Sequence, residues 1–204
     1  MKKNKISKNW VNKQRRDIYV RQSKVDGYRA RSAYKLIEID EKFKIFKGGL
    51  LVIDIGAAPG SWSQYTSKIV KNGKTVSIDL KEMEPIPNTI QIKGDFTKNK
   101  IQQEIKDILP GNADVVMSDM APNISGNRVV DQARAMNLAE DAFRFAIETL
   151  NEGGSFLTKL FQGEGFEEFI GVAKQHFESV RIFKPKASRS ESREVYMLAR
   201  TYGI

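Results

Sequence analysis

Carboxylates end three successive apolar stretches of the chain, and the first of these stretches runs into a turn rich in glycine. The turn lies in VIDIGAAPGSWSQY, where Asp54 precedes Gly56 and Gly60. Asp79 closes the next stretch, VSIDL, about 20 residues further on, where a carboxylate is expected to accept hydrogen bonds from ribose hydroxyls. Asp95, in IKGDF, ends the third stretch and is placed to reach the edge of an adenine ring. The pattern predicts a site for a cofactor that contains a nucleoside, with Asp54 organising the turn.

The turn does not match two common classes of phosphate-binding loop. A P-loop requires GxxxxGK[ST], and no lysine follows in GAAPGSWS, which begins at Gly56. The dinucleotide fingerprint GxGxxG also fails, because Pro59 stands between Gly56 and Gly60. A cofactor with ribose and adenine but without a phosphate cradle suggests S-adenosylmethionine.

Strands and helices alternate along the chain, and the strands are almost continuously apolar. Such alternation predicts an α/β fold with a mostly parallel sheet covered by helices on both faces. The last two strands are joined by a short polar link, so we expect them to pair antiparallel. The expected strands are residues 49–56, 73–80, 88–96, 113–120, 153–161, 179–187 and 193–200. The expected helices are residues 29–43, 61–71, 98–109, 131–150 and 164–177.

Composition removes several classes of function. The chain of 204 residues has no cysteine, which excludes thiol nucleophiles, disulfides, iron–sulfur clusters and cysteine-ligated zinc. No apolar run reaches about 18 residues, so we expect no transmembrane helix. The basic N-terminus has no apolar h-region, which argues against a secretory signal. We expect a cytoplasmic protein, a monomer, without a bound metal and without a membrane partner.

Positive charge is concentrated at the N-terminus. The net charge is +9, and residues 1–35 carry twelve Lys and Arg against two Asp and Glu. Trp10, Tyr19, Tyr28 and Tyr34 are interleaved with that charge, which favours an arm that binds a polyanion over a solvated tail. We expect residues 1–29 to be a basic RNA-binding arm and residues 30–204 to form a single catalytic domain. A second basic cluster, RIFKPKASRSESR, is available to extend the same surface.

Five stretches carry a resemblance to a known family. They are RSAYKL, DIGAAPGSWSQY, SDMAPNISG, FLTKLFQGEGF and KPKASRSESREVYMLA. In order and spacing these stretches resemble the FtsJ-type ribose 2′-O-methyltransferases, over about residues 10–202. The resemblance implies a Rossmann-like methyltransferase fold of seven strands, with the last strand antiparallel, and S-adenosylmethionine as the cofactor. It also implies that Gly60, Trp62, Asp79, Asp95 and Asp119 bind that cofactor.

The resemblance further implies a catalytic tetrad of Lys35, Asp119, Lys159 and Glu194. Lys159 lies inside the apolar stretch SFLTKLF, where an unpaired charge is costly, so it needs a carboxylate partner. Asp119 on the neighbouring strand is the natural partner. As a neutral amine Lys159 would act as a general base, and as an ammonium it would steer the hydroxyl and stabilise an oxyanion. The resemblance to the family favours the role of general base for Lys159.

Features that the chain lacks exclude two classes of methyl acceptor. Carbon-5 methylation of pyrimidines generally uses a cysteine nucleophile, and amino-methyltransferases of bases carry an Asn/Asp-Pro-Pro-aromatic turn where this chain has DMAPN. A ribose hydroxyl remains. The resemblance implies a uridine in the A loop of large-subunit (23S) ribosomal RNA, methylated on the assembled subunit to support ribosome maturation. Two alternatives stay open: a 2′-O-methyltransferase of transfer RNA or of a messenger cap, and a non-catalytic RNA-binding assembly factor.

Overall fold

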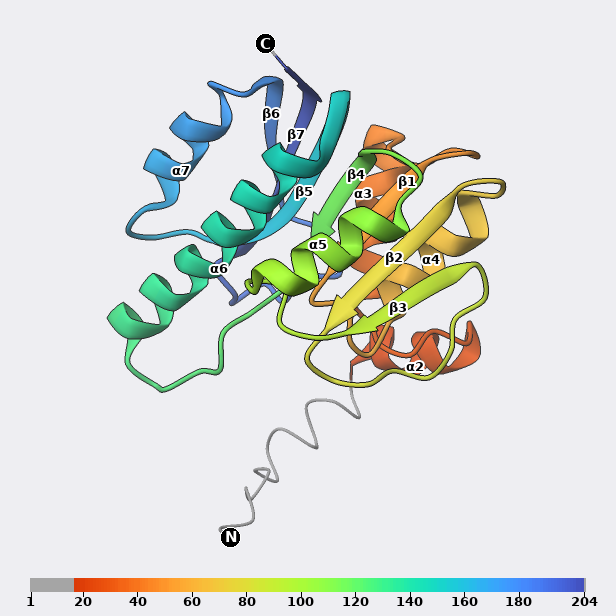
Figure 1. Ribbon diagram of the computed structural model, residues 1–204. Coiled ribbons are helices and arrows are strands. Elements are labelled where there is room, and N and C mark those ends of the chain that lie inside the picture. Colours follow the sequence, from red (N-terminus) through yellow and green to blue (C-terminus); the bar gives the residue numbers. More distant parts are fainter. Residues whose placement is uncertain (1–16, 204) are drawn as a thin grey trace, which may run out of the picture.

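The computed structural model describes residues 17–203, and its strands form one seven-stranded sheet in the order β3-β2-β1-β4-β5-β7-β6 (Figure 1). Strands β1 to β6 run in one direction, and β7 runs antiparallel to both of its neighbours, β5 and β6. This sheet confirms the predicted α/β class and the antiparallel last strand. The strands are β1 (Leu51–Ile55), β2 (Lys74–Asp79), β3 (Thr89–Lys93), β4 (Ala113–Ser118), β5 (Leu150–Phe161), β6 (Phe177–Phe183) and β7 (Glu194–Tyr202).

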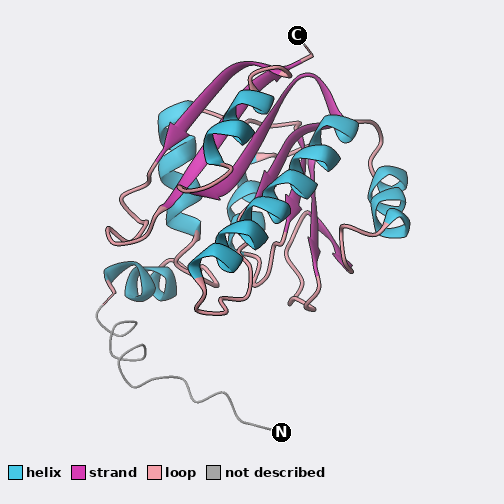
Figure 2. Ribbon diagram, turned by 90° about the vertical axis from the view of Figure 1, so that its left-hand side faces the viewer, coloured by secondary structure: helices cyan, strands magenta, loops and turns pink. Residues whose placement is uncertain are grey.

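Helices cover both faces of the sheet (Figures 1 and 2). They are α2 (Ile18–Val25), α3 (Ala33–Phe43), α4 (Ser61–Ile69), α5 (Asn99–Ile108), α6 (Arg128–Thr149) and α7 (Phe166–Ala173). Helices α5, α6 and α7 pack on one face, where Phe143 and Phe156 belong to the larger apolar core. Helices α3 and α4 pack on the other face, around Leu36 and Trp62. The described residues contain no helix that is long and apolar enough to cross a membrane.

The structure differs from the sequence-based expectation near the N-terminus. Residues 18–25, within the predicted arm, form α2, and the Asp17 carboxylate accepts hydrogen bonds from the backbone N–H groups of Tyr19 and Val20. This is the usual N-cap contact of a helix. The next helix begins at Ala33 rather than at residue 29, because residues 29–32 form a turn. Residues 1–16 of the arm lie outside the described residues.

Arg29, the first residue of that turn, ties the N-terminal segment to the sheet. Arg29 donates from its guanidinium to the carbonyls of Pro59 and Pro85, both at 3.0 Å, in the loops that follow β1 and β2. Its backbone N–H donates to Gln64 of α4 at 2.9 Å. The end of the predicted arm is thereby packed against the loops at the edge of the sheet.

The parallel strands bring their carboxyl ends to one edge of the sheet. The antiparallel strand β7 begins at this same edge, because Glu194 is paired with Phe161 at the end of β5. In the same register Lys159 lies opposite Tyr196. Open α/β sheets bind their ligands at this edge. Residues distant in the sequence are therefore placed together where chemistry is expected.

Candidate active site

The glycine turn after β1 permits a close approach of the backbone to its neighbours. Gly56 has φ of +72°, and a Cβ added there would lie 2.2 Å from Cγ of Met120. The left-handed φ and the lack of space both require glycine at this position. The amide nitrogen of Gly56 donates to the carbonyl of Ile78 at 2.8 Å, which holds the turn against β2.

A cavity of about 590 Å³ opens where β1, β2, β3 and β4 end. This volume lies within the usual range for ligand pockets. Its walls combine apolar side chains with the carboxylates of Asp79, Asp95 and Asp119. The apolar part includes Ile78, Leu80, Phe96 and Leu138. An adenosyl group with a positively charged sulfonium fits such a lining, since flat apolar walls suit the base and carboxylates suit the hydroxyls and the charge.

Backbone groups orient the two carboxylates that were expected to contact ribose and adenine. One oxygen of Asp79 accepts from the backbone N–H of Ala58 at 2.9 Å, and the other accepts from that of Lys81 at 2.8 Å. Asp95 accepts from the backbone N–H of Thr97 at 3.1 Å and from its hydroxyl at 2.7 Å. Each oxygen of Asp79 has a second lone pair, and both bonds to Asp95 go to Oδ1, so both side chains retain acceptor capacity.

Asp54 is buried beneath the turn and does not line the large cavity. Its carboxylate accepts from the hydroxyl of Ser63 at 2.6 Å, and that hydroxyl is 2.6 Å from the hydroxyl of Ser77. Burial raises the pKa of Asp54 to about 7, and the carboxylates of Asp119 and Asp79 act in the same direction, while the hydrogen bond from Ser63 opposes them. The contact with Ser63 joins β1 to α4, as expected of a residue that organises the turn.

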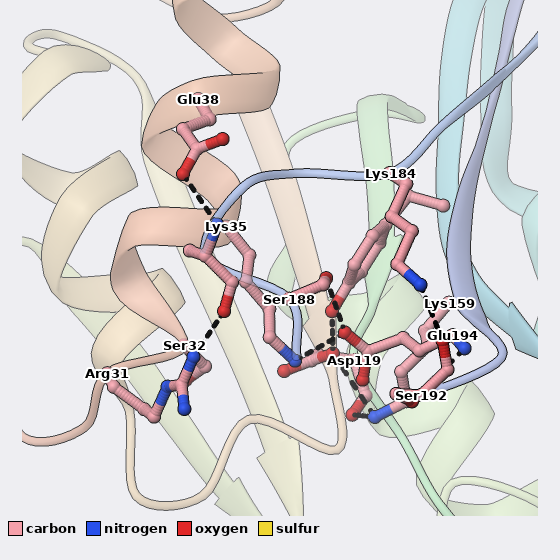
Figure 3. A network of polar contacts seen from close by, with 12 residues as sticks. Arg31, Ser32, Lys35, Glu38, Asp119, Lys159, Lys184, Ser188, Ser192 and Glu194 are labelled. Atoms are coloured by element: carbon pink, nitrogen blue, oxygen red, sulfur yellow. Dashed lines mark hydrogen bonds and ion pairs between the residues drawn. The ribbon is translucent and has the colours of Figure 1, made fainter. Parts of the chain in front are cut away.

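The four predicted tetrad residues lie together (Figure 3). Nζ of Lys159 is 3.2 Å from Oδ1 of Asp119 and donates to the backbone carbonyl of the same residue at 2.6 Å. Nζ of Lys35, on α3, is 2.7 Å from Oε1 of Glu194 at the start of β7. The Lys159 side chain is only 7% exposed and that of Asp119 is 18% exposed. The ion pair predicted from the apolar surroundings of Lys159 is therefore present.

Tyr196 links the two ion pairs, and sequence reasoning missed it. Its hydroxyl donates to Oδ1 of Asp119 at 2.6 Å, and Nζ of Lys35 lies 5.7 Å from the centre of its ring. Burial raises the pKa of the Tyr196 phenol, and the carboxylates of Asp119 and Glu194 raise it further. The phenol therefore stays protonated and fixes the Asp119 carboxylate as a hydrogen-bond acceptor.

A family model for FtsJ-like methyltransferases matches residues 28–202 of the chain. The chain belongs to the FtsJ-like methyltransferase family. Two named relatives match over nearly their whole length. The chain is 58% identical to ribosomal RNA large subunit methyltransferase E of Pelagibacter ubique, with 98% of each chain covered. It is 45% identical to the protein of the same name from Legionella pneumophila, with 100% of each covered.

Solved structures agree with this family. A Plasmodium falciparum protein described as a ribosomal RNA methyltransferase superimposes with a TM-score of 0.78 at 33% identity, covering 86% of this chain and 98% of its own. A protein from Streptococcus mutans assigned as a methyltransferase, in complex with SAH, superimposes with a TM-score of 0.54 at 16% identity, covering 80% and 95%. The second likeness supports the fold alone.

Membership of the FtsJ-like family makes the protein an S-adenosylmethionine-dependent methyltransferase, which confirms the cofactor expected from the sequence. The large cavity, with Asp79, Asp95 and Asp119 in its wall, is where this methyltransferase has room for that cofactor. The cofactor supplies an electrophilic methyl group when bound. The described residues hold no cluster of three or more His, Cys, Asp and Glu side chains arranged for a metal.

Two of the predicted cofactor-binding residues of this FtsJ-like protein lie outside the lining of the large cavity. Gly60 is the N-cap of α4, with φ of +103°, and a Cβ there would lie 2.7 Å from Ile86. Trp62 is buried, donates from its indole nitrogen to the carbonyl of Ser32 at 2.9 Å, and lies 5.7 Å from the ring of Tyr196. With Asp54 and Asp119 it lines a small cavity of about 30 Å³. Their contact with the cofactor stays a prediction.

The loop between β6 and β7 is held against α3 and contacts Glu194 of the tetrad (Figure 3). Glu38 accepts hydrogen bonds from the backbone N–H groups of Lys186 at 2.6 Å and Ala187 at 2.8 Å. Ser188, in the same loop, donates to Oε1 of Glu194 at 2.8 Å. This is the oxygen that pairs with Lys35. The loop thereby orients the carboxylate at the start of β7.

Proposed function

We propose that the protein transfers a methyl group from S-adenosylmethionine to the 2′-hydroxyl of a uridine in large-subunit (23S) ribosomal RNA. The acceptor is the A loop on the assembled large subunit, and the modification supports ribosome maturation in the cytoplasm. The observation that carries the proposal is the Lys159–Asp119 pair, in which Asp119 lines the cofactor cavity, together with the neighbouring pair of Lys35 and Glu194. Two relatives named ribosomal RNA large subunit methyltransferase E share 58% and 45% sequence identity with the chain over nearly their full length. Their names support ribosomal RNA as the substrate class.

Lys159 is the general base in this proposal. A neutral lysine amine has two hydrogens and one lone pair, and Asp119 offers an acceptor for each hydrogen, its backbone carbonyl at 2.6 Å and Oδ1 at 3.2 Å. The lone pair is then free to accept the proton of the 2′-hydroxyl. A general base placed within hydrogen-bonding reach of its proton accelerates a reaction by roughly 10²–10⁴-fold.

The other three residues hold Lys159 and the acceptor in place. Asp119 fixes the direction of the Lys159 amine and also lines the cofactor cavity. Lys35 and Glu194 form a second ion pair, in which both side chains are largely buried. In the proposal this pair positions the acceptor ribose, and Lys35 stabilises the negative charge that develops on the ribose oxygen.

The uridine and the A loop rest on the resemblance of the sequence motifs to the FtsJ-type ribose methyltransferases. The basic arm, residues 1–29, carries most of the excess positive charge of the protein. We propose that this arm binds the phosphates of ribosomal RNA. The sheet domain outside residues 1–35 is close to neutral, so the arm supplies the attraction to a polyanion.

The test is to offer the protein three acceptors with labelled S-adenosylmethionine. These are large ribosomal subunits from cells that lack this methyltransferase, protein-free ribosomal RNA from the same subunits, and a mixture of transfer RNA and capped messenger RNA. We expect label on the subunits, at a single nucleotide. Label confined to the transfer RNA or the cap would replace the proposed substrate, and no transfer to any acceptor would favour a non-catalytic assembly factor.

A further inference from the structure

A further cavity, of about 370 Å³, lies next to the cofactor cavity, and we refer to it as the α6 groove. Ala121 and Pro122, in the loop after β4, line both cavities. The α6 groove is otherwise formed by the first two turns of α6, the end of β5 and the residues just before β7. The mechanism above makes no use of it.

The α6 groove adjoins three of the four tetrad residues along the chain. Ala121 follows Asp119 by two residues, Phe161 follows Lys159 by two residues, and Arg193 directly precedes Glu194. Side chains alternate along a strand, so Phe161 and Lys159 of β5 emerge on the same face, about 7 Å apart along the strand. This separation is within the reach of one nucleotide.

The lining of the groove suits a nucleobase. Phe161 offers a partly exposed aromatic ring that belongs to neither apolar core, and Ile124 is 84% exposed. The guanidinium groups of Arg128 and Arg193 stand at its rim, and Arg193 is held by a 3.0 Å hydrogen bond to the carbonyl of Gln162. Unpaired bases stack on such aromatic and guanidinium surfaces.

Two carboxylates also line the groove, and both accept hydrogen bonds from nearby residues of the chain. Asp131 accepts from the backbone N–H and the hydroxyl of Ser125 at 2.8 and 2.7 Å, and from the backbone N–H of Gly126 at 3.1 Å. Glu191 accepts from the hydroxyl of Ser190 at 3.3 Å. The Asp131 contacts hold the loop that carries Pro122 and Ile124 against the start of α6.

We propose that the α6 groove receives the base of the acceptor nucleotide, stacked against Phe161, while its ribose reaches Lys159. This inference rests on the proposed function, and it deepens it in one respect. A base that occupies the groove is neither paired nor stacked within RNA, so the acceptor nucleotide must be unpaired when it is methylated.

Gln132 is a positioning residue for this groove. Its side-chain nitrogen donates to the carbonyls of Phe161 and Glu164, both at 3.0 Å, and these two bonds fix the backbone at the end of β5. Gly163 packs against the same amide, since a Cβ at that position would lie 2.9 Å from Cδ of Gln132. The chain that carries Phe161 therefore has a defined place beside Lys159.

The test compares Phe161→Leu with Phe161→Tyr, using large ribosomal subunits from cells that lack the enzyme as the acceptor. Loss of a stacking ring typically weakens binding by about tenfold or more, so kcat/KM for subunits should fall by at least that factor in Phe161→Leu. Phe161→Tyr keeps an aromatic face and should remain within about threefold of the wild type. Binding of S-adenosylmethionine, measured by calorimetry, should be unchanged in both variants.

Salt separates a base contact from a phosphate contact. The loss in Phe161→Leu should be the same factor at low and at physiological salt, because stacking releases no counterions. Arg128→Gln, whose matched control is Arg144→Gln at the far end of α6, should lose affinity with a reduced salt dependence. Ile124→Ser changes a side chain that is 84% exposed and tests the same wall without risk to the fold.

The inference fails if Phe161→Leu and Ile124→Ser both methylate subunits as the wild type does. It also fails if the loss in Phe161→Leu shrinks as salt rises, which would assign the groove to phosphate. A wild-type protein that does not methylate subunits at all would contradict the proposed function instead, so the two failures are distinguishable.

Discussion

At the residue scale, the proposed general base is a lysine amine that is buried and paired with one carboxylate. Lys159 is 7% exposed, and its two polar contacts among the described residues go to one neighbour, Asp119. Asp119 in turn accepts from Tyr196, whose protonated phenol holds it. Asp119 thus sets the orientation of the Lys159 amine. Loss of the amine and loss of the carboxylate should therefore have different consequences.

Removal of the amine should affect chemistry and spare cofactor binding. Lys159 is absent from the lining of the cofactor cavity, whereas Asp79 and Asp95 belong to it. For Lys159→Ala we expect an affinity for S-adenosylmethionine within a few fold of the wild type by calorimetry, and turnover lower by at least about a hundredfold. Turnover within a few fold of the wild type would remove Lys159 from the role of base.

Removal of the carboxylate should affect both steps. Asp119 lines the cofactor cavity and pairs with Lys159, so Asp119→Ala leaves the buried Lys159 side chain without its polar partner and also alters the cavity. We expect both cofactor affinity and turnover to fall. Asp119→Asn keeps an acceptor for the Tyr196 hydroxyl and serves as the control. Normal cofactor affinity in Asp119→Ala would restrict this residue to catalysis.

The buried carboxyl of Asp54 should make stability depend on pH. Its pKa is raised by burial to about 7 from an ordinary value of 3.8, so the folded protein binds a proton that the unfolded chain releases. Stability from this group is complete below about pH 4 and is lost as pH rises through 7, by up to about 4 kcal/mol. Denaturant unfolding from pH 5 to 8 should show a smaller decline in Asp54→Asn. An identical pH dependence in the two proteins would contradict the buried, protonated Asp54.

Residue types predicted part of the site, and tertiary register supplied the remainder. Lys159 was identifiable because a charge inside an apolar strand requires a partner, and that partner is present. Tyr196 was not identifiable, because its position opposite Lys159 depends on the antiparallel register of β5 and β7. Trp62 lies under the turn beside Tyr196, a placement that helical periodicity does not specify.

At the scale of elements, the loop between β6 and β7 is a support for the tetrad. Glu38 on α3 binds two of its backbone N–H groups, and Lys184 binds the carbonyls of Ser190 and Ser192 at 3.3 and 2.5 Å. The loop is therefore fastened at both ends, with Ser188 against Glu194 between them.

Loss of the Glu38 contact should loosen this loop. Hydrogen bonds to a charged group contribute about 1.5–3 kcal/mol each, so we expect Glu38→Ala to lower the free energy of unfolding by about 1–3 kcal/mol after relaxation. Turnover should also fall, because Glu194 and Lys35 lose their support. Glu41→Ala, an exposed change on the same helix, is the control for denaturant unfolding. Equal stability of the two variants would show that the loop does not depend on Glu38.

The order of elements was predictable, and their ends were less so. Apolar runs separated by helical periodicity predicted all seven strands, because parallel strands covered on both faces must be apolar throughout. Helix α2 was missed, although Asp17 before an amphipathic stretch is an N-cap signal. The basic charge around it favoured a reading as an arm. Strand β5 begins at Leu150, directly after α6, and not at residue 153 as expected. The expectation placed a turn before Gly153 and Gly154, whereas these glycines lie within the strand.

At the scale of the whole molecule, the net charge of +9 is located almost entirely in residues 1–35. We expect neutralisation of Lys8, Lys13, Arg15 and Arg16 together to lower the slope of log affinity against log salt for large ribosomal subunits. The decrease should be about two to four, since each phosphate contact contributes roughly 0.7–0.9. Affinity for S-adenosylmethionine should not change, because Lys35 and the sheet are intact. An unchanged slope would make the arm a solvated tail.

The most direct test of the central claim is the chemical position of the transferred methyl group. Subunits from cells lacking the enzyme are incubated with the wild type and with Lys159→Ala, and the ribosomal RNA is digested to nucleosides for mass spectrometry. A 2′-O-methyl group also makes its phosphodiester bond resistant to alkali, which locates the nucleotide. We expect one 2′-O-methyluridine with the wild type and at least about a hundredfold less with the variant. A methyl group on a base, or equal 2′-O-methylation by both proteins, would contradict this claim.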